Sequence, residues 1–180
     1  DGHGTHCAGV ISAVSDNNKG ICGISNAKLM ALKVFNSAGT SYDSAIIAAF
    51  NYIYKAQTLG ANIAAINCSW GGGGSSSTSM KTLINQIGQN GSLFLFAAGN
   101  DGENHDNAIS DGCPYDLDSP YVVTVGASTQ TDKKASFSDY GNKTFCTGPE
   151  YFFHNKFRCF LPFRLHRQYA KFTVFVFHLF

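Results

Sequence analysis

Three near-continuous apolar runs, each bounded by glycine or polar residues, constrain the fold of this chain more than any other feature. They are "NIAAINCS" (62–69), "SLFLFAAG" (92–99) and "PYVVTVGAS" (120–128). Runs of this length and type are typical of strands that are apolar on both faces, with no alternating polar face for solvent. Strands of that kind occur in parallel sheets covered by helices on both sides, so we expect that architecture.

The segments that precede and separate these runs complete strand–helix units. "KLMALKVF" (28–35) is a short apolar strand candidate, and residues 41–60 follow with apolar positions at helical spacing. Ser41 or Asp43 is the expected helix cap and Gly60 the expected stop. The pattern predicts a single α/β domain with a mainly parallel sheet.

Two further helices are predicted. The segment between the strands at 62–69 and 92–99 contains "STSMKTLINQIGQNG", which predicts a capped helix beginning at Ser77 or Thr78. The opening "DGHGTHCAGVISAV" predicts a helix from about His3. Helices on both faces would then cover the sheet.

The composition changes near residue 150. Residues 1–150 carry all 12 acidic residues and all 19 glycines, whereas residues 151–180 carry 5 Lys/Arg, no acid and 9 of the 15 phenylalanines. These basic residues leave no apolar run of about 18 residues, so we expect no membrane span in the tail, and membrane association is not expected. The overall balance of 13 basic and 12 acidic residues indicates no nucleic-acid partner.

In parallel sheets, ligands bind at the carboxyl ends of the strands, and two unusual loops stand there. They are "NCSWGGGG" (67–74) and "AAGNDGENHDN" (97–107). Neither loop shows the glycine spacing of a phosphate-binding loop, so a nucleotide site is not indicated. The glycines would instead let another chain approach the backbone closely.

The opening helix would place His3, His6 and Cys7 at positions i, i+3 and i+4 on one face. That spacing suits a metal, although a zinc site needs further ligands that the spacing does not identify. Taken alone, the histidines could equally be core or capping residues. Cys7 is predicted to be a buried free thiol, because no cysteine stands at a suggestive spacing.

Four segments, taken in order, carry a resemblance to a known family. "DGHGTHCAG", "NCSWGG", "FAAGND" and "PYVVTVGA" followed by "FSDYG" closely resemble segments of the subtilisin-like serine peptidases, the subtilases. The resemblance covers roughly residues 1–145 and implies an incomplete subtilisin-like three-layer fold. It also implies a serine endopeptidase that cleaves peptide bonds through an acyl-enzyme, with polypeptides as substrates.

The resemblance assigns a role to each matching position. It implies that His3 is the catalytic base, with His6 as a structural neighbour, and that Asn100 donates to the oxyanion. It implies that Ser69, Trp70 and Gly71 form an extended edge that pairs with the substrate backbone. Ala98 and Gly99 would form the opposite wall of the substrate site. The chemistry needs no metal or other cofactor, and a structural calcium ion remains open without a located site.

The departures from the family are as informative as the matches. The triad runs Asp, His, Ser in this family, so the Asp is expected upstream of residue 1. No G-T-S-M-A segment carrying the nucleophile follows "FSDYG", and Ser79 in "STSMKT" is rejected because it precedes Asn100 and lacks the flanking residues. We therefore expect this fragment to be inactive on its own. Two alternatives stay open: a non-catalytic peptide-binding module, and a metal-binding protein that uses His3, His6 and Cys7.

Residues 1–150 are thus predicted to be a partial subtilase peptidase domain, and residues 151–180 a non-family tail. Because glycine and acids vanish where the family continues toward its nucleophile, we expect a shifted reading frame or an unspliced intron; replacement by a basic aromatic tail is the alternative. The resemblance implies an extracellular or vacuolar/lysosomal monomer, and no targeting segment is visible. Asn67, Asn90 and Asn142 head glycosylation sequons, of which Asn67 is expected to be too buried.

Overall fold

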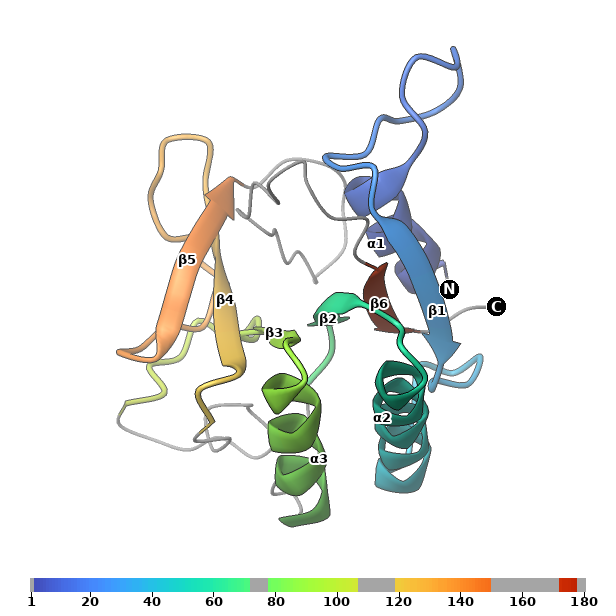
Figure 1. Cartoon of the computed structure of the whole chain (residues 1–180). Helices are drawn as coiled ribbons and strands as arrows, with labels where there is room; N and C mark the ends of the chain where they lie inside the picture. Colours follow the sequence, from blue (N-terminus) through green and yellow to red (C-terminus); the bar gives the residue numbers. More distant parts are fainter. Residues whose placement is uncertain (1, 72–77, 107–118, 150–171, 178–180) are drawn as a thin grey trace.

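The computed structural model describes residues 2–71, 78–106, 119–149 and 172–177, the last segment and residues 145–149 by their backbone. One six-stranded, all-parallel sheet has the strand order β1-β6-β2-β3-β4-β5 (Figure 1). The helices are α1 (His3–Ser12), α2 (Asp43–Thr58) and α3 (Thr78–Gln89). The strands are β1 (Lys28–Lys33), β2 (Ile63–Cys68), β3 (Leu93–Ala97), β4 (Val122–Ser128), β5 (Thr144–Pro149) and β6 (Phe172–Phe177).

Helices lie on both faces of this sheet, as the sequence predicts. Figure 1 shows α1 beside β1 and β6 on one side of the strands, and α2 with α3 on the other side. The fold is therefore the predicted α/β type with a mainly parallel sheet between helical layers. The three helices begin at or within two residues of the predicted positions, and β2, β3 and β4 fall inside the predicted strands.

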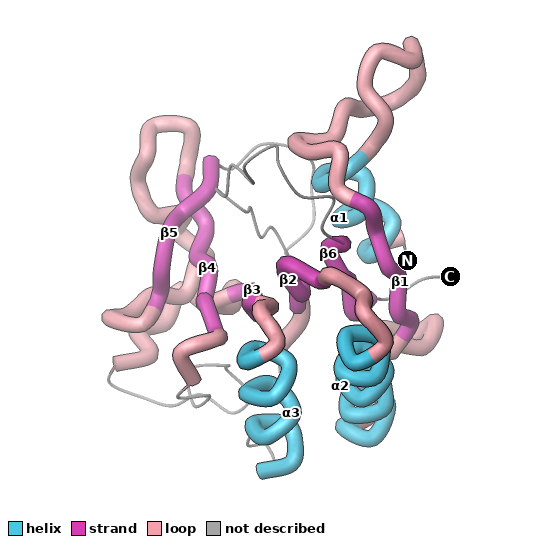
Figure 2. The backbone as a smooth tube through the Cα atoms, viewed as in Figure 1, coloured by secondary structure: helices cyan, strands magenta, loops and turns pink. Residues whose placement is uncertain are grey.

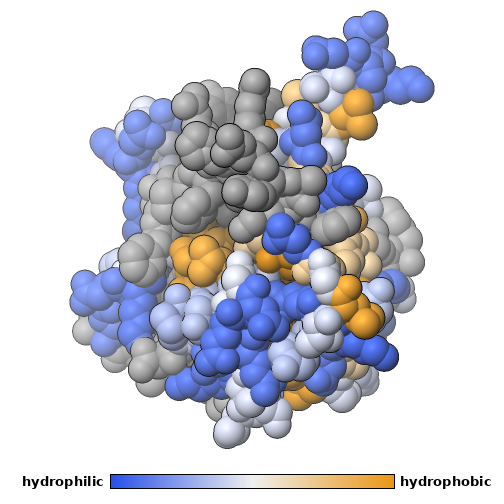
Figure 3. Space-filling model, viewed as in Figure 1, coloured by the Kyte–Doolittle hydropathy of each residue, from blue (hydrophilic) through white to orange (hydrophobic). Residues whose placement is uncertain are grey.

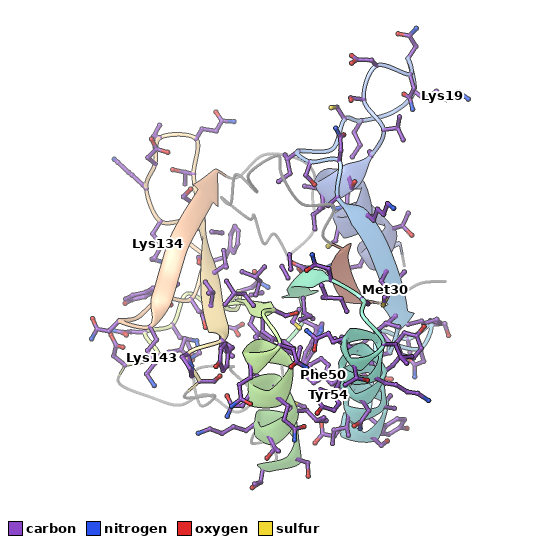
Figure 4. The ribbon with its side chains drawn as sticks, viewed as in Figure 1. Lys19, Met30, Phe50, Tyr54, Lys134 and Lys143 are labelled. Carbon is purple, nitrogen blue, oxygen red and sulfur yellow. The ribbon has the colours of Figure 1, made fainter. Side chains whose placement is uncertain are left out.

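The core lies between the sheet and the layer formed by α2 and α3. Phe50 of α2, labelled in Figure 4, is fully buried. It meets Phe94 of β3 edge-on, with ring centroids 5.1 Å apart. Ile84 and Ile87 of α3 are also fully buried against this layer. Burying an aromatic or branched side chain of this size contributes about 1.5–3 kcal/mol, so these residues fix the helices to the sheet.

The strands differ in burial according to their place in the sheet. β2 is enclosed, and its Asn67 is only 2% exposed, which confirms that this sequon lies too deep in the core to be accessible. β1 lies at an edge, and Leu29 and Ala31 are exposed there. The expectation that strands are covered on both faces therefore holds for the centre of the sheet but not for β1.

The predicted cap of α2 is wrong. The N-cap is Tyr42 in extended conformation, with no side-chain cap hydrogen bond, and Ser41 lies one residue before it, where its hydroxyl donates to the carbonyl of Val34 at 2.7 Å. Asp43 lies inside the first helical turn, where its charge favours the positive end of the helix dipole. Gly60 stands just past the helix with φ 94°, as expected for a stop residue.

A loop after α1 extends away from the rest of the molecule (Figure 2). Its base is tied back by hydrogen bonds from Ile24 N to Val10 O (3.0 Å) and from Ser25 N to Ile11 O (2.9 Å). Lys19 lies at its far end (Figure 4), and Figure 3 shows a hydrophilic tip above a hydrophobic patch. No helix in the described ranges combines the length and apolar character needed to cross a membrane.

Two strands were not anticipated from the sequence. β5 continues the sheet beyond β4, and β6 lies between β1 and β2, pairing in parallel with both. β6 therefore places part of the tail inside the sheet. That residues 151–180 lie outside the family stays a prediction. An extended segment of any origin can pair with a sheet through its backbone, so the pairing of β6 does not test it.

Candidate active site

The predicted base stands at the first position of α1. Gly2, with φ 76°, precedes the helix, and Cys7 follows His3 by one turn. His3 Nε2 lies 3.8 Å from Cys7 Sγ, so the two side chains are in contact on the same helix face. His3 as a whole is half-buried.

The neighbouring His6 is exposed and does not join this contact. The helix does place His3, His6 and Cys7 at i, i+3 and i+4, but a contact is seen only between His3 and Cys7 among these three residues. Within the described residues, no group of three or more His, Cys, Asp or Glu side chains could hold a metal ion.

Cys7 links the helix to the end of β2. Burial raises the pKa of the Cys7 thiol from 9.0 to about 11, and a hydrogen bond with the Ser69 side chain opposes this shift in part. The thiol thus contacts the predicted base on one side and the first residue of the predicted substrate edge on the other. Cys7 is a free thiol, as predicted, although the residue is half-buried rather than fully buried.

The predicted substrate edge continues from β2. Ser69 is 2% exposed, and its Oγ accepts a hydrogen bond from Asn67 Nδ2 at 2.8 Å. Trp70 packs edge-on against Phe96, with ring centroids 5.4 Å apart, while Gly71 is exposed. The aromatic ring thus anchors the segment to the sheet, and the backbone emerges at Gly71.

The opposite wall follows β3, the neighbour of β2. The register pairs Cys68 with Phe96, so both segments leave the sheet at the same carboxyl edge. Ala98 is buried and donates its N–H to Val125 O at 2.9 Å, and Gly99 has φ 122°. Asn100 is half-buried, and its side chain makes no hydrogen bond within the part of the chain that the structure describes.

Ser79 lies elsewhere. It is exposed in the first turn of α3, and Figure 1 shows α3 on the opposite side of the strands from α1. This placement agrees with its rejection as a nucleophile.

The structure also shows a buried pair that sequence reasoning missed. His105 Nε2 lies 3.0 Å from Asp139 Oδ2, and both residues are at most 6% exposed. They stand 34 residues apart, and no spacing rule connects them. The only signal was that Asp139 lies within "FSDYG", which resembles a subtilase segment, and that resemblance does not predict a contact with His105.

Comparison with known proteins shows the family of this chain. The family profile described as the subtilase family matches residues 1–150. The chain belongs to the subtilase family. It is 38% identical over 143 residues to Subtilisin DY of Bacillus licheniformis, covering 78% of this chain and 48% of the relative. It is 36% identical over 144 residues to an extracellular protease of Xanthomonas campestris, covering 77% of this chain and 24% of the relative.

Solved subtilase structures share the fold. A psychrophilic subtilisin-like protease of Pseudoalteromonas sp. AS-11 matches with a TM-score of 0.64 and 34% identity, over 80% of this chain and 31% of that one. A protease of Pseudoalteromonas arctica matches with a TM-score of 0.65 and 28% identity, over 79% and 42%. This subtilase chain therefore spans less than half the length of these relatives.

Proposed function

We propose that the protein to which this subtilase chain belongs is a serine endopeptidase that cleaves polypeptides through an acyl-enzyme. The observation that supports it most strongly is the convergence around Cys7, whose thiol contacts both His3 and Ser69. The helix carrying the base is thereby joined to the strand end that would hold the substrate. The Ala98–Asn100 segment leaves the adjacent strand at the same edge.

In this proposal His3 moves the proton. An imidazole ionises near neutral pH, so it can accept the proton of a serine hydroxyl and return it to the leaving amine. The nucleophile and the residue that orients His3 lie outside the family segments found in this sequence. In the proton transfer itself, this chain therefore contributes only the base, His3.

Asn100 would stabilise the transition state. Attack on the amide places negative charge on the former carbonyl oxygen, and a fixed side-chain N–H there favours the transition state over the ground state. The side-chain amide of Asn100 at the end of β3 suits this role. The backbone of Ser69–Gly71 on one side, and of Ala98 and Gly99 on the other, would hold the substrate as an extended strand.

The test is kinetic and uses the intact protein with a chromogenic peptide substrate. His3→Ala should abolish turnover, and Asn100→Ala should lower kcat by about 10²–10³-fold, the loss known for the equivalent donor in subtilisin itself. Because the oxyanion exists only in the transition state, KM should change little in Asn100→Ala. Peptide binding without hydrolysis by the wild-type protein would favour a non-catalytic peptide-binding module instead.

We also propose that residues 1–180 alone do not hydrolyse peptides, because the sequence contains no family nucleophile segment. Turnover by this polypeptide that a serine-directed inhibitor abolishes would contradict this. The chemistry is proposed to need no metal. Peptide hydrolysis by the intact protein should therefore not require a metal ion as a participant in the reaction, which dialysis against a chelator tests. Retention of stoichiometric zinc by this chain after dialysis would support the metal-binding alternative.

The names of its relatives support an extracellular location, and a monomer that acts on polypeptides is proposed. Residues 151–180 are proposed to come from a shifted reading frame or an unspliced intron. Translating the surrounding DNA in all three forward frames tests this directly. A G-T-S-M-A segment in another frame or a following exon is expected, whereas a transcript-verified stop with no such segment in any frame would exclude it.

A further inference from the structure

A buried acid–imidazole pair lies directly behind the predicted oxyanion residue. Asp139 is 3% exposed and His105 is 6% exposed, and their side chains meet at 3.0 Å. Among the residues that the structure describes, His105 provides the one basic side chain within 4 Å of the Asp139 carboxylate. Burying a carboxylate costs folding free energy unless its oxygens accept hydrogen bonds. The partners of the Asp139 carboxylate therefore indicate its role.

Asp139 holds the chain on both sides of Asn100. Its own N–H donates to Gly99 O at 3.3 Å, just before Asn100. Its Oδ1 accepts from Asp101 N at 2.9 Å, just after Asn100, and from Glu103 N at 2.9 Å. Hydrogen bonds to an ionised carboxylate are among the stronger ones in proteins, so this side chain fixes the backbone that carries Asn100.

The second carboxylate oxygen is held by a different contact. Oδ2 faces His105 Nε2, and it lies so close to Gly99 that a Cβ at that position would be 1.9 Å away. An ionised carboxylate can only accept, so Nε2 must carry the hydrogen of this bond. His105 fixes the rotation of the carboxylate, and the missing side chain at Gly99 makes room for it.

The backbone around the pair is also fixed. His105 N donates to Tyr140 O at 2.9 Å, and Tyr140 N donates to Glu103 O at 3.0 Å. The segment after β3 and the segment 135–142 are therefore linked on both sides of the Asp139 side chain.

The other charged groups nearby face elsewhere. Lys134 Nζ donates to Ser138 O at 2.9 Å and lies 4.8 Å from the centre of the Tyr140 ring. The Asp106 carboxylate accepts from Asn142 N, and Figure 4 shows Lys143 at the side of the molecule formed by β4 and β5. Asp101 and Glu103 contact Asp139 through their backbone N–H groups.

We propose that Asp139, held in place by His105, is a positioning residue that orients Asn100 for oxyanion stabilisation. This inference rests on the proposed peptidase function. The Asn100 side chain makes no hydrogen bond in the described residues, so its orientation depends on the backbone on either side of it, to which Asp139 is hydrogen-bonded. A misplacement of about 1 Å at such a group can lower the rate about 10²-fold. Hydrogen bonds to the residues directly before and after Asn100 can therefore have a large effect on kcat.

The first arm of the test needs no catalysis. Amide hydrogen exchange is followed by NMR in this 180-residue chain, comparing wild type with Asp139→Ala and Asp139→Asn. Asp139→Ala removes both carboxylate oxygens, so protection at Asp101 and Glu103 should be lost while Thr124 in β4 stays protected. Asp132→Asn is the matched control, because Asp132 is exposed with φ 57°, which Asn tolerates.

The second arm measures kinetics in the intact protein, normalised to active-site titration. A positioning role predicts that Asp139→Asn lowers kcat per active site by about 10- to 100-fold with little change in KM, because a misplaced donor costs about this much. A purely structural role would instead lower the fraction of titratable sites. His105→Ala should lower kcat in the same way, and His105→Gln, which retains a side-chain N–H, should restore much of it.

Loss of protection at Asp101 and Glu103, together with a kcat effect rescued by His105→Gln, would support the inference. Unchanged protection in Asp139→Ala, or normal kcat per active site in both Asp139 variants, would overturn it. Wild-type protein without turnover would count against the proposed function, and hydrogen exchange alone would then decide whether Asp139 holds the loop.

Discussion

At the scale of single residues, Cys7 is the side chain that connects the parts of the site. It touches His3 and Ser69, and burial raises its pKa to about 11. The thiolate is the reactive form, so Cys7 should resist alkylation at pH 8 while the exposed Cys22 reacts readily. Peptide mapping by mass spectrometry after iodoacetamide treatment checks this, and modification of Cys7 at the rate of Cys22 would contradict it.

The same pKa makes stability depend on pH. In the unfolded chain Cys7 loses its proton near pH 9.0, whereas the folded chain keeps it to about 11. Above pH 9 the folded state binds more protons than the unfolded state, so the free energy of unfolding should fall as pH rises from about 9 to about 11. Urea denaturation across this range checks the slope. Cys7→Ala should flatten it, and an equal slope in both proteins would exclude Cys7 as the cause.

Gly99 offers a second test at this scale. A methyl group there would meet Asp139 Oδ2, and φ is 122°, so Gly99→Ala combines backbone strain with a clash. Gly60 also has a positive φ, 94°, but nothing within 4 Å of its Cβ position. Gly60→Ala should therefore cost about 1–2 kcal/mol in unfolding free energy. Gly99→Ala should cost about 1–3 kcal/mol more, because overpacking adds to the strain. Equal losses in urea denaturation would show that Asp139 gives way.

Sequence reasoning could propose site residues only where short motifs specify them, and it missed contacts that only the fold brings about. His3, Ser69 and Asn100 remain predicted site residues, each proposed because it lies in a segment whose local sequence is distinctive. The pairing of His105 with Asp139 depends on how two loops return to each other, and no local pattern encodes it. The spacing of His3, His6 and Cys7 was predicted correctly, but the spacing does not show that His6 is exposed while His3 and Cys7 are half-buried and in contact.

At the scale of elements, α3 and the strand start at Tyr121 fit together through a glycine. A Cβ on Gly88 would lie 2.1 Å from Tyr121 Cγ, near the base of that side chain, which cannot easily move aside. Helix propensity alone would make Gly88→Ala stabilising by about 1 kcal/mol. Overpacking costs about 1–3 kcal/mol, so we expect net destabilisation.

Gly9 of α1 is the matched control for this prediction. Its Cβ position is 3.3 Å from Ile21 Cδ1, the flexible end of an exposed side chain. Gly9→Ala should therefore be neutral or stabilising in urea denaturation. A stabilising effect of Gly88→Ala would mean that Tyr121 is free to repack.

Helices and strands could be predicted where the apolar pattern of the sequence is strong. They could not be predicted where the element is recognised only from its pairing in the sheet. β2, β3 and β4 are buried runs whose composition reveals them, and α2 and α3 have clear apolar faces. β5 and β6 were missed, although β6 has the strand-favouring sequence FTVFVF, because it lies in the segment set apart as a non-family tail. The cap of α2 was missed because the N-cap is Tyr42, one residue after Ser41, and its side chain makes no cap hydrogen bond, while the Ser41 hydroxyl binds the carbonyl of Val34.

At the scale of the whole molecule, the sheet includes a strand from outside the family match. β6 separates β1 from β2, and β1 has no other strand neighbour in the described sheet. Truncation after residue 149 should therefore strip hydrogen-exchange protection from residues 28–33 and leave β3 and β4 protected. Unchanged protection of β1 in the truncated chain would show that β6 does not hold it.

If His3 is the base of a serine peptidase, labelling of the nucleophile depends on it. The intact protein is treated with a fluorophosphonate, which modifies an activated serine, and the modified residue is identified by mass spectrometry. We expect stoichiometric labelling of one serine in wild type and in His6→Ala, whose side chain is exposed, and loss of labelling in His3→Ala. Undiminished labelling in His3→Ala, or no labelled serine in the wild-type protein, would contradict it.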